Sequence, residues 1–302
     1  MTQREWLDLA DKAGRTYDQQ VKSVNQDPTL RDFALLASNT FFLISAVVDS
    51  GLKSTKNEHN RSVFHYLLTK GMKSYRSIDV LCLMGNDQDA MALLRTLVDT
   101  VITLRYMVVE DTDNRVRRFM DYEAVEQRKR VQTYQNMLKE GCITPEEFKL
   151  AFPDADEPQR IETKFAAFVA KYLVGKSSDR SWSGKDTLGM AKAPLVGMVS
   201  DYLKAFKSFS LYTHPTGLAM KAYVQQNLLS WSPSSSQATN SYLISTHYLL
   251  ELFDNYCEAL GTPIPSEVKD QITINTLIRL QRVGYQSNLV KSEIGLGQWA
   301  IL

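Results

Sequence analysis

The residues best suited to chemistry in this chain form a short polar stripe and a helix end. Arg95, Asp99 and Tyr106 share one face of a predicted helix at about 100° per residue. An arginine oriented by a carboxylate can grip a phosphate in two places, and a tyrosine adds a hydroxyl and a stacking face. His214 stands beside Pro215 at a predicted helix end, where the helix dipole raises the basicity of an imidazole. The pattern predicts an anion site in which His214 is a general acid or base and Arg95 stabilises negative charge.

The same residues also have a structural interpretation. The helix that carries the stripe, Asp87 to Glu110, is apolar on nearly every other face, so it belongs in a core. A buried arginine and a buried carboxylate are costly unless they pair, so Arg95 and Asp99 form either an internal salt bridge or the wall of a site. His214 in turn could cap the last carbonyls of its helix. The sequence leaves these alternatives open.

Neighbouring segments supply further candidates. Arg76 and Asp79 lie near each other on the preceding helix and would extend the polar network. Trp182 lies in the irregular segment 175–189, and we expect it on a loop that closes over the pocket. His247 stands one helical turn before a glutamate, but no further histidine or cysteine cluster completes a metal site. We therefore predict no metal and no cofactor.

Composition excludes several classes of protein. Lysine plus arginine (35) nearly cancels aspartate plus glutamate (34), so no overall field draws the chain to nucleic acid or an anionic membrane. The three cysteines lack CxxC spacing, which is typical of a reducing compartment, and we predict a cytoplasmic protein. The N-terminus does not have the pattern of a signal peptide. The longest apolar stretch, Phe33 to Val48, has about 16 residues where a membrane span needs roughly 20, so we predict a buried helix and no transmembrane segment.

The elements that must position these residues are helices. Helical periodicity recurs along the chain and no segment alternates as a strand would, so we predict an all-α bundle of about eight to ten helices with mostly antiparallel neighbours. Asp27 should cap a helix that has Pro28 in its first turn, Gly85 should end another, and Thr144 should open a capping box. The other expected helices span 3–24, 87–110, 115–139, 194–213, 238–260 and 265–289.

The polar stretch 54–60 is a candidate hinge. It predicts an N-terminal helical pair, residues 1–53, packed on a main helical-bundle domain, residues 61–302. A single domain over residues 1–302 is the alternative.

Several short motifs occur in an order typical of one bacterial family. They are ALLRTLVD (92–99), LRY (104–106), RRFMDY (117–122), WSG (182–184), and Tyr202 with Ser210 and His214. Over roughly residues 64–260 this order resembles the uncharacterised bacterial helical family known as domain of unknown function 5677. The resemblance implies the helical fold and the polar site, and it implies no established reaction. The family pattern more often has glutamate where this chain has the shorter Asp99.

A looser similarity is to the helical ribonuclease and nucleotide-binding proteins of bacterial toxin and phage-defence systems. Their motif places an arginine a few residues before a polar histidine. Here Lys207 occupies that place, with six residues between it and His214. Lysine lacks the planar fork with which arginine grips phosphate.

We therefore expect an intracellular bacterial protein with a buried polar pocket for an anionic ligand, either phosphate-containing or derived from RNA. A stress or phage-defence effector with phosphodiester-cleaving nuclease activity would fit. The expected catalytic residues are His214, Arg95 and Asp99, and the expected binding residues are Tyr106, Trp182 and Lys207. The alternative is a non-catalytic interaction module in which Arg95 and Asp99 form a structural salt bridge. In both cases the apolar tail, Ile294 to Leu302, could join two copies into a homodimer.

Overall fold

The computed structural model of the chain describes residues 3–49, 57–173, 181–206, 224–225, 228–229, 238–262, 264 and 270. Within these residues the protein is all-α, as predicted, apart from the short antiparallel strands β1 (Val224–Gln225) and β2 (Leu228–Leu229). The helices are α1 (Gln3–Gln26), α2 (Pro28–Asp49), α3 (Arg61–Leu83), α4 (Asp87–Val108), α5 (Thr112–Asp121), α6 (Glu123–Lys139), α7 (Pro145–Ala151), α8 (Glu157–Tyr172), α9 (Thr187–Ala191), α10 (Val199–Lys204) and α12 (Ala238–Leu260), with a 3-10 turn, η1 (Glu58–Asn60), before α3.

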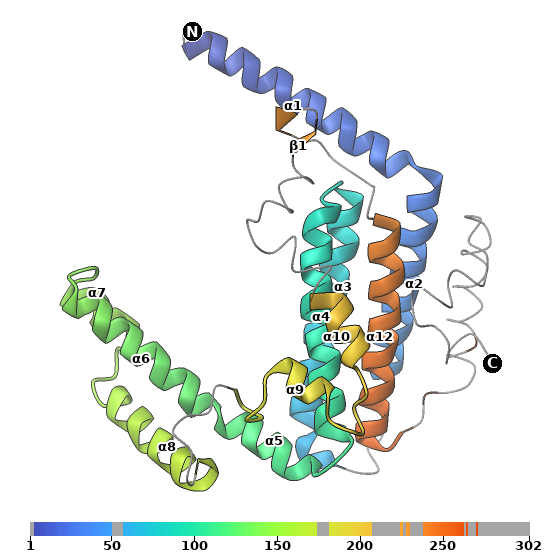
Figure 1. The fold of residues 1–302 in the computed structure, drawn as a ribbon. Helices are drawn as coiled ribbons and strands as arrows, with labels where there is room; N and C mark the ends of the chain where they lie inside the picture. Colours follow the sequence, from blue (N-terminus) through green and yellow to red (C-terminus); the bar gives the residue numbers. More distant parts are fainter. Residues whose placement is uncertain are drawn as a thin grey trace.

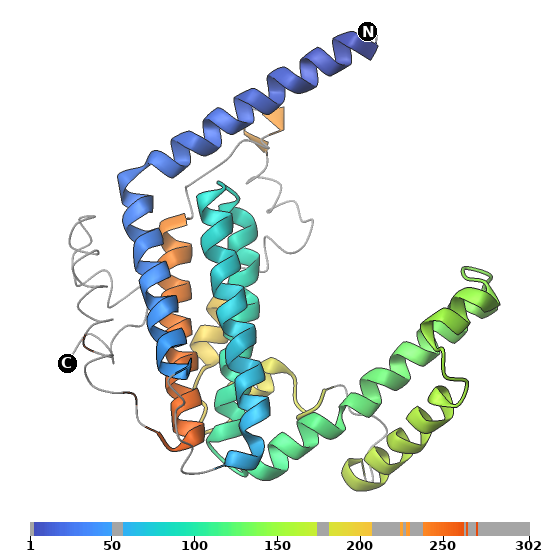
Figure 2. The same cartoon turned by 180° about the vertical axis from the view of Figure 1, so that it is seen from behind.

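Four long helices, α2, α3, α4 and α12, form the central bundle (Figure 1). Helix α4 packs against α3 and α12, and α2 packs against both α12 and α3 from behind (Figure 2). Gly85 joins α3 to α4 with a φ of 76°, a left-handed conformation that favours glycine. The two helices therefore run antiparallel, as the short connection predicted.

The core of the bundle lies around α4. Eight of its apolar residues are 0% exposed: Ala90, Leu94, Leu97, Val98, Val101, Ile102, Leu104 and Met107. They belong to one cluster with Phe33 of α2, Phe64 of α3 and Leu252 of α12. This burial confirms the prediction that the apolar helix with the polar stripe belongs in a core.

The predicted helix starts are present. The Asp27 carboxylate accepts hydrogen bonds from the backbone N–H of Thr29 at 2.8 Å and of Leu30 at 3.4 Å, which caps α2. Thr144 and Glu147 form the capping box of α7, with the Thr144 N–H donating to Glu147 at 2.8 Å. These local signals act within a few residues, so they can be recognised without knowledge of the fold.

Helices α6, α7 and α8, here called the arm, project from the bundle and are joined to it by α5 (Figures 1 and 2). Helices α6 and α8 pack on each other through two small apolar clusters of their own. One cluster contains Tyr122, Val125, Phe168 and Leu173. The arm is therefore held together by its own apolar contacts, and one of its faces is turned toward the bundle.

Two predicted helices have different bounds. The single helix expected over 115–139 is wrong, because the chain turns at Tyr122 and divides into α5 and α6. Tyr122 is buried against Phe168 of α8. Helix α6 begins at the next residue and packs along α8. The helix expected from Pro194 begins instead at Val199, since Gly197 has a φ of 64° that no right-handed helix contains.

Helix α2 has the length and apolar composition of a membrane-spanning helix, a test that core helices of soluble proteins also pass. In this structure Leu30, Phe33, Leu36 and Ile44 of α2 are buried in the cluster shared with α3, α4 and α12. The proposed division between residues 1–53 and 61–302 stays a prediction.

Candidate functional site

A cleft of about 1310 Å³ lies where the arm leaves the bundle. Its bundle side is formed by α3 and α4, and its other side by α5, α6 and α8. Aromatic side chains line much of it: Tyr66, Phe119, Tyr122, Phe168 and Trp182. The charged residues that line it are Lys70, Lys164, Lys171, Asp99, Asp121, Glu123 and Glu126. Of the predicted site residues, this cleft contains Asp99 and Trp182.

Asp99 is the half-buried carboxylate of the α4 wall. Burial raises the pKa of Asp99 above its ordinary value, and the charges of Arg95 and Lys70 act in the opposite direction. Among the described residues, none forms a hydrogen bond or ion pair with its carboxylate. A carboxylate with a raised pKa in a cleft is typical of functional sites, because burial without a partner is unfavourable for folding alone.

Three threonines of α4, Thr96, Thr100 and Thr103, line the same wall as Asp99. The Thr100 hydroxyl donates to the Thr96 carbonyl at 2.8 Å, and the Thr103 hydroxyl donates to the Asp99 carbonyl at 2.7 Å. Each of these two hydroxyls has one proton, so both offer only acceptor lone pairs to the cleft. The α4 wall therefore presents a carboxylate, two hydroxyl acceptors, and the hydroxyl of Thr96, which can donate or accept.

Lysines reach the cleft from both sides. Lys70 is exposed on α3, and Lys164 is exposed on α8. Neither makes an ion pair within the described residues. Lys171 differs, because its ammonium binds Asp121 at 2.8 Å while the Tyr172 hydroxyl donates to the same carboxylate at 2.7 Å. Among the described residues that line the cleft, Lys70 and Lys164 are thus the cations without an ion-pair partner.

Trp182 joins the bundle to the arm. Its ring lies edge-on to Phe119, with 5.3 Å between ring centroids, and edge-on to Tyr106, with 5.8 Å. It also packs against the arm cluster that contains Tyr122 and Phe168. We expected Trp182 on a loop over a pocket, and the structure places it in a turn that lines the cleft. Its role in binding stays a prediction.

Tyr106 and Arg95 have other neighbours. The Tyr106 ring is buried, and the Arg115 guanidinium lies 3.9 Å above its centroid. The Arg95 guanidinium lies 4.5 Å above the ring of Phe206, two residues beyond α10. Neither residue lines the cleft in the described part of the chain. Arg95, Asp99 and Tyr106 each contact different elements along α4. Their shared helical face therefore did not bring the three residues into one site.

An ion pair with a buried carboxylate lies on α3. Arg76 and Asp79 pair on α3, and Asp79 is only 1% exposed. The Tyr242 hydroxyl of α12 donates to the Asp79 carboxylate at 3.1 Å. We expected this pair to extend the α4 stripe, but in the described structure its partner helix is α12. His214 and Lys207 lie outside the described residues, as does the tail 294–302.

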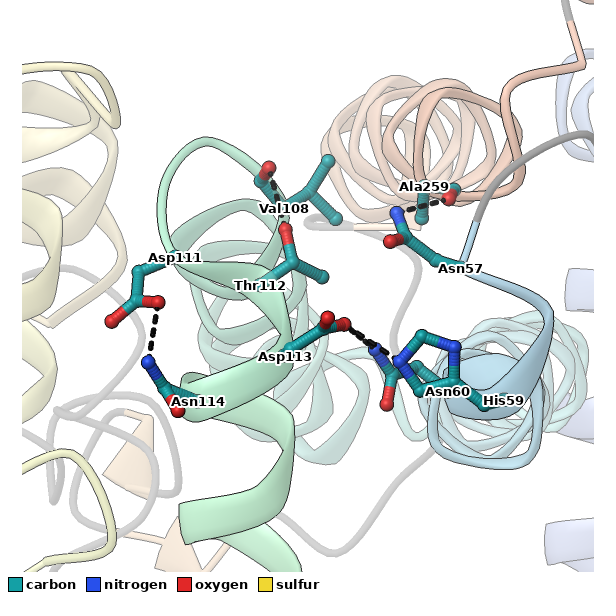
Figure 3. A network of polar contacts seen from close by, with 9 residues as sticks. All are labelled: Asn57, His59, Asn60, Val108, Asp111, Thr112, Asp113, Asn114 and Ala259. Atoms are coloured by element: carbon teal, nitrogen blue, oxygen red, sulfur yellow. Dashed lines mark hydrogen bonds and ion pairs between the residues drawn. The ribbon is translucent and has the colours of Figure 1, made fainter.

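A polar network at the end of the bundle anchors α5, and through α5 the arm (Figure 3). Asp113 of α5 accepts a hydrogen bond from the Asn60 side chain at 2.7 Å and contacts the His59 ring at 2.8 Å. Both hydrogen bonds lower the pKa of Asp113. The Asn57 side chain donates to the Ala259 carbonyl of α12 at 2.9 Å. The network holds the start of α3, the start of α5 and the end of α12 together.

The lysines of the cleft, and its aromatic residues other than Trp182, were missed from the sequence. Lys70 and Lys164 belong to helices that meet only in the folded chain, and each reads as an ordinary solvent-exposed residue of an amphipathic helix. No local pattern distinguishes them. The RRFMDY motif contains Phe119 and Tyr122, two of the lining aromatics, and was the available signal for these two.

Comparisons with known proteins identify the family. The model of a family of unknown function, DUF5677, matches residues 61–227. The chain belongs to this family. The DUF5677 region includes every residue that lines the cleft, from Tyr66 to Trp182. No curated protein and no solved structure matches the chain, so the looser similarity to helical ribonucleases has no support from these comparisons.

Proposed function

We propose that the cleft of this DUF5677 protein binds an anionic small ligand that carries a planar ring, as a nucleotide does. The observation that carries the proposal is the pair Lys70 and Lys164, which reach one aromatic-lined cleft from opposite sides without ion-pair partners in the described structure. Ammonium groups bind phosphate as point charges, so cations that reach the cleft from two sides favour an anionic ligand.

The aromatic lining supports a ring-bearing ligand. Trp182 and Phe119 are held by ring contacts to their neighbours, so their positions are fixed before a ligand arrives. Pre-ordered aromatic surfaces bind planar rings at low entropic cost, and stacking on one aromatic side chain contributes about 1–3 kcal/mol per base.

Carboxylates also line the cleft, and one of them already has a lysine partner. Asp121 is bound by Lys171 and Tyr172, and Glu123 accepts a hydrogen bond from Gln127 at 2.7 Å. Asp99 and Glu126 are the other carboxylates of the cleft. Phosphodiester cleavage through His214 is a separate prediction and is not needed for binding.

Equilibrium dialysis of the full chain against GMP, AMP, CMP and UMP tests the proposal, and native mass spectrometry of the purified protein checks for a bound ligand. We expect at least one nucleotide to bind, and Lys70→Gln and Lys164→Gln each to weaken it about tenfold. Lys73→Gln is the matched control, since Lys73 is exposed on the same helix as Lys70 and does not line the cleft.

The absence of binding by any of the four nucleotides would overturn the proposal. An equal loss in Lys70→Gln and Lys73→Gln would do so too, because it would show a general charge effect. Either result would favour the alternative in which the protein is an interaction module.

A further inference from the structure

The hydrogen-bonding groups of the α4 wall restrict which ligand edge can bind there. We propose that this wall binds the donor edge of a guanine ring, so that the ligand of the cleft is a guanine nucleotide. This inference rests on the proposed function, since it names the ring that the same cleft would take.

The wall is selective because its acceptors outnumber its donors. The protons of Thr100 and Thr103 are committed to helix carbonyls at 2.8 and 2.7 Å, so neither hydroxyl can rotate to donate without losing that bond. The Asp99 carboxylate lies beside them on the same wall and has no described hydrogen-bond partner. Three acceptor groups within two turns of one helix favour a ligand edge that carries adjacent N–H groups.

Guanine has such an edge. Its ring N1–H and its exocyclic amino group are neighbouring donors, and one carboxylate can accept from both. Adenine offers an amino group beside a ring nitrogen acceptor, which would face the Asp99 carboxylate unfavourably. Xanthine replaces the exocyclic amino group of guanine with a carbonyl, so it also sets an acceptor against the wall. Matched pairs of this kind contribute about 1–3 kcal/mol of discrimination between bases.

The rest of the cleft suits the remainder of a nucleotide. Lys164 lies on α8, across the cleft from α4, where it can reach the phosphate of a ligand whose base contacts Asp99. Lys70 is close enough to influence the pKa of Asp99, so it lies at the α4 side of the cleft. Trp182 and Phe119 provide apolar ring surface between the two sides.

Isothermal titration calorimetry of the full chain with GMP, AMP and XMP tests the inference. We expect GMP to bind at least tenfold more tightly than AMP or XMP. Asp99→Asn should lower the affinity for GMP by about 10- to 100-fold. It should raise the affinity for XMP, because the asparagine amide can donate to the xanthine carbonyl. Asp89→Asn is the control, since Asp89 is exposed on α4 and does not line the cleft.

Thr103→Val provides a second variant that changes no charge. It removes one acceptor while keeping the shape of the side chain. The affinity for GMP should fall several-fold, and the affinity for XMP should not rise. Its thermal unfolding midpoint, compared with that of the unmodified chain, checks that it folds.

The outcomes separate this inference from the proposed function. Equal affinities for GMP, AMP and XMP would overturn the guanine assignment and leave an anion-binding cleft. A GMP preference that persists in Asp99→Asn would also overturn it, because the preference would then arise elsewhere. No binding by any nucleotide would overturn both.

Discussion

Asp79 and Asp99 are carboxylates on adjacent helices of one bundle, and their surroundings differ. Asp79 is 1% exposed and is bound by Arg76 and by the Tyr242 hydroxyl at 3.1 Å. Asp99 is half-buried at the edge of a cleft, and no described residue bonds to its carboxylate. Burial raises the pKa of both. A raised pKa alone therefore does not distinguish a structural carboxylate from a candidate site residue.

The two carboxylates differ in whether other described residues bond to them. The partners of Asp79 come from its own helix and from α12, so the group helps to hold two helices together. Breaking such a contact destabilises the fold, because the buried group that remains loses a bonding partner. Asp99 contributes no such contact. Its acceptors face a cleft, where a ligand can supply the missing donors.

Asp79→Ala should have the largest effect on stability. It removes the buried carboxylate that Arg76 and the Tyr242 hydroxyl bind. The hydroxyl keeps the Asp79 backbone carbonyl as an acceptor at 3.2 Å and the half-exposed Arg76 can be hydrated, so we expect a loss of about 2 kcal/mol in the free energy of unfolding. Urea denaturation measures it, with Asp89→Ala on the exposed face of α4 as the control. A loss below about 0.5 kcal/mol, the usual range for surface changes, would mean that Asp79 has no structural role.

Tyr242→Phe isolates one partner of Asp79. It removes a buried hydroxyl donor and leaves the Arg76 ion pair, so we expect a loss of about 1 kcal/mol in the free energy of unfolding. The variant should also raise the pKa of Asp79 further, since one bond to the charged form is lost. Urea denaturation at neutral pH gives the first quantity. If the loss equalled that of Asp79→Ala, the Arg76 pair would contribute nothing of its own.

Asp99→Asn should have the smallest effect on stability and the clearest effect on its pH dependence. A carboxyl whose pKa is raised in the folded state binds its proton more tightly there than in the unfolded chain. Its contribution to stability is therefore fully present below the ordinary value of 3.8 and is lost as pH rises through the folded-state pKa. Asparagine removes that dependence.

We expect the Asp99→Asn variant to be as stable as the unmodified chain at neutral pH within about 0.5 kcal/mol, or slightly more stable. Between pH 3.8 and neutrality its free energy of unfolding should fall less steeply as pH rises. Urea denaturation across this range measures the slope. A clear destabilisation at neutral pH would show that Asp99 is structural and would weaken the comparison with Asp79.

Part of the fold could be predicted because its signals are local. The caps at Asp27 and Thr144 act within three residues, and the turn at Gly85 depends on the conformation of one residue. The apolar periodicity of α4 determined that this helix lies in the core. The same reasoning failed at Tyr122, where a contact with α8 ends α5 and starts α6.

The candidate site could be predicted only in part. The sequence by itself determined an all-α fold and singled out Asp99 as a polar residue on a buried helix. It could not determine which carboxylate is satisfied, because Asp79 and Tyr242 are separated by 163 positions in the chain. Nor could it place Lys164 opposite Lys70. Helical patterns depend on neighbours a few residues apart, whereas the partners of a buried charge and the walls of a cleft depend on how distant helices pack, and only the tertiary structure decided these.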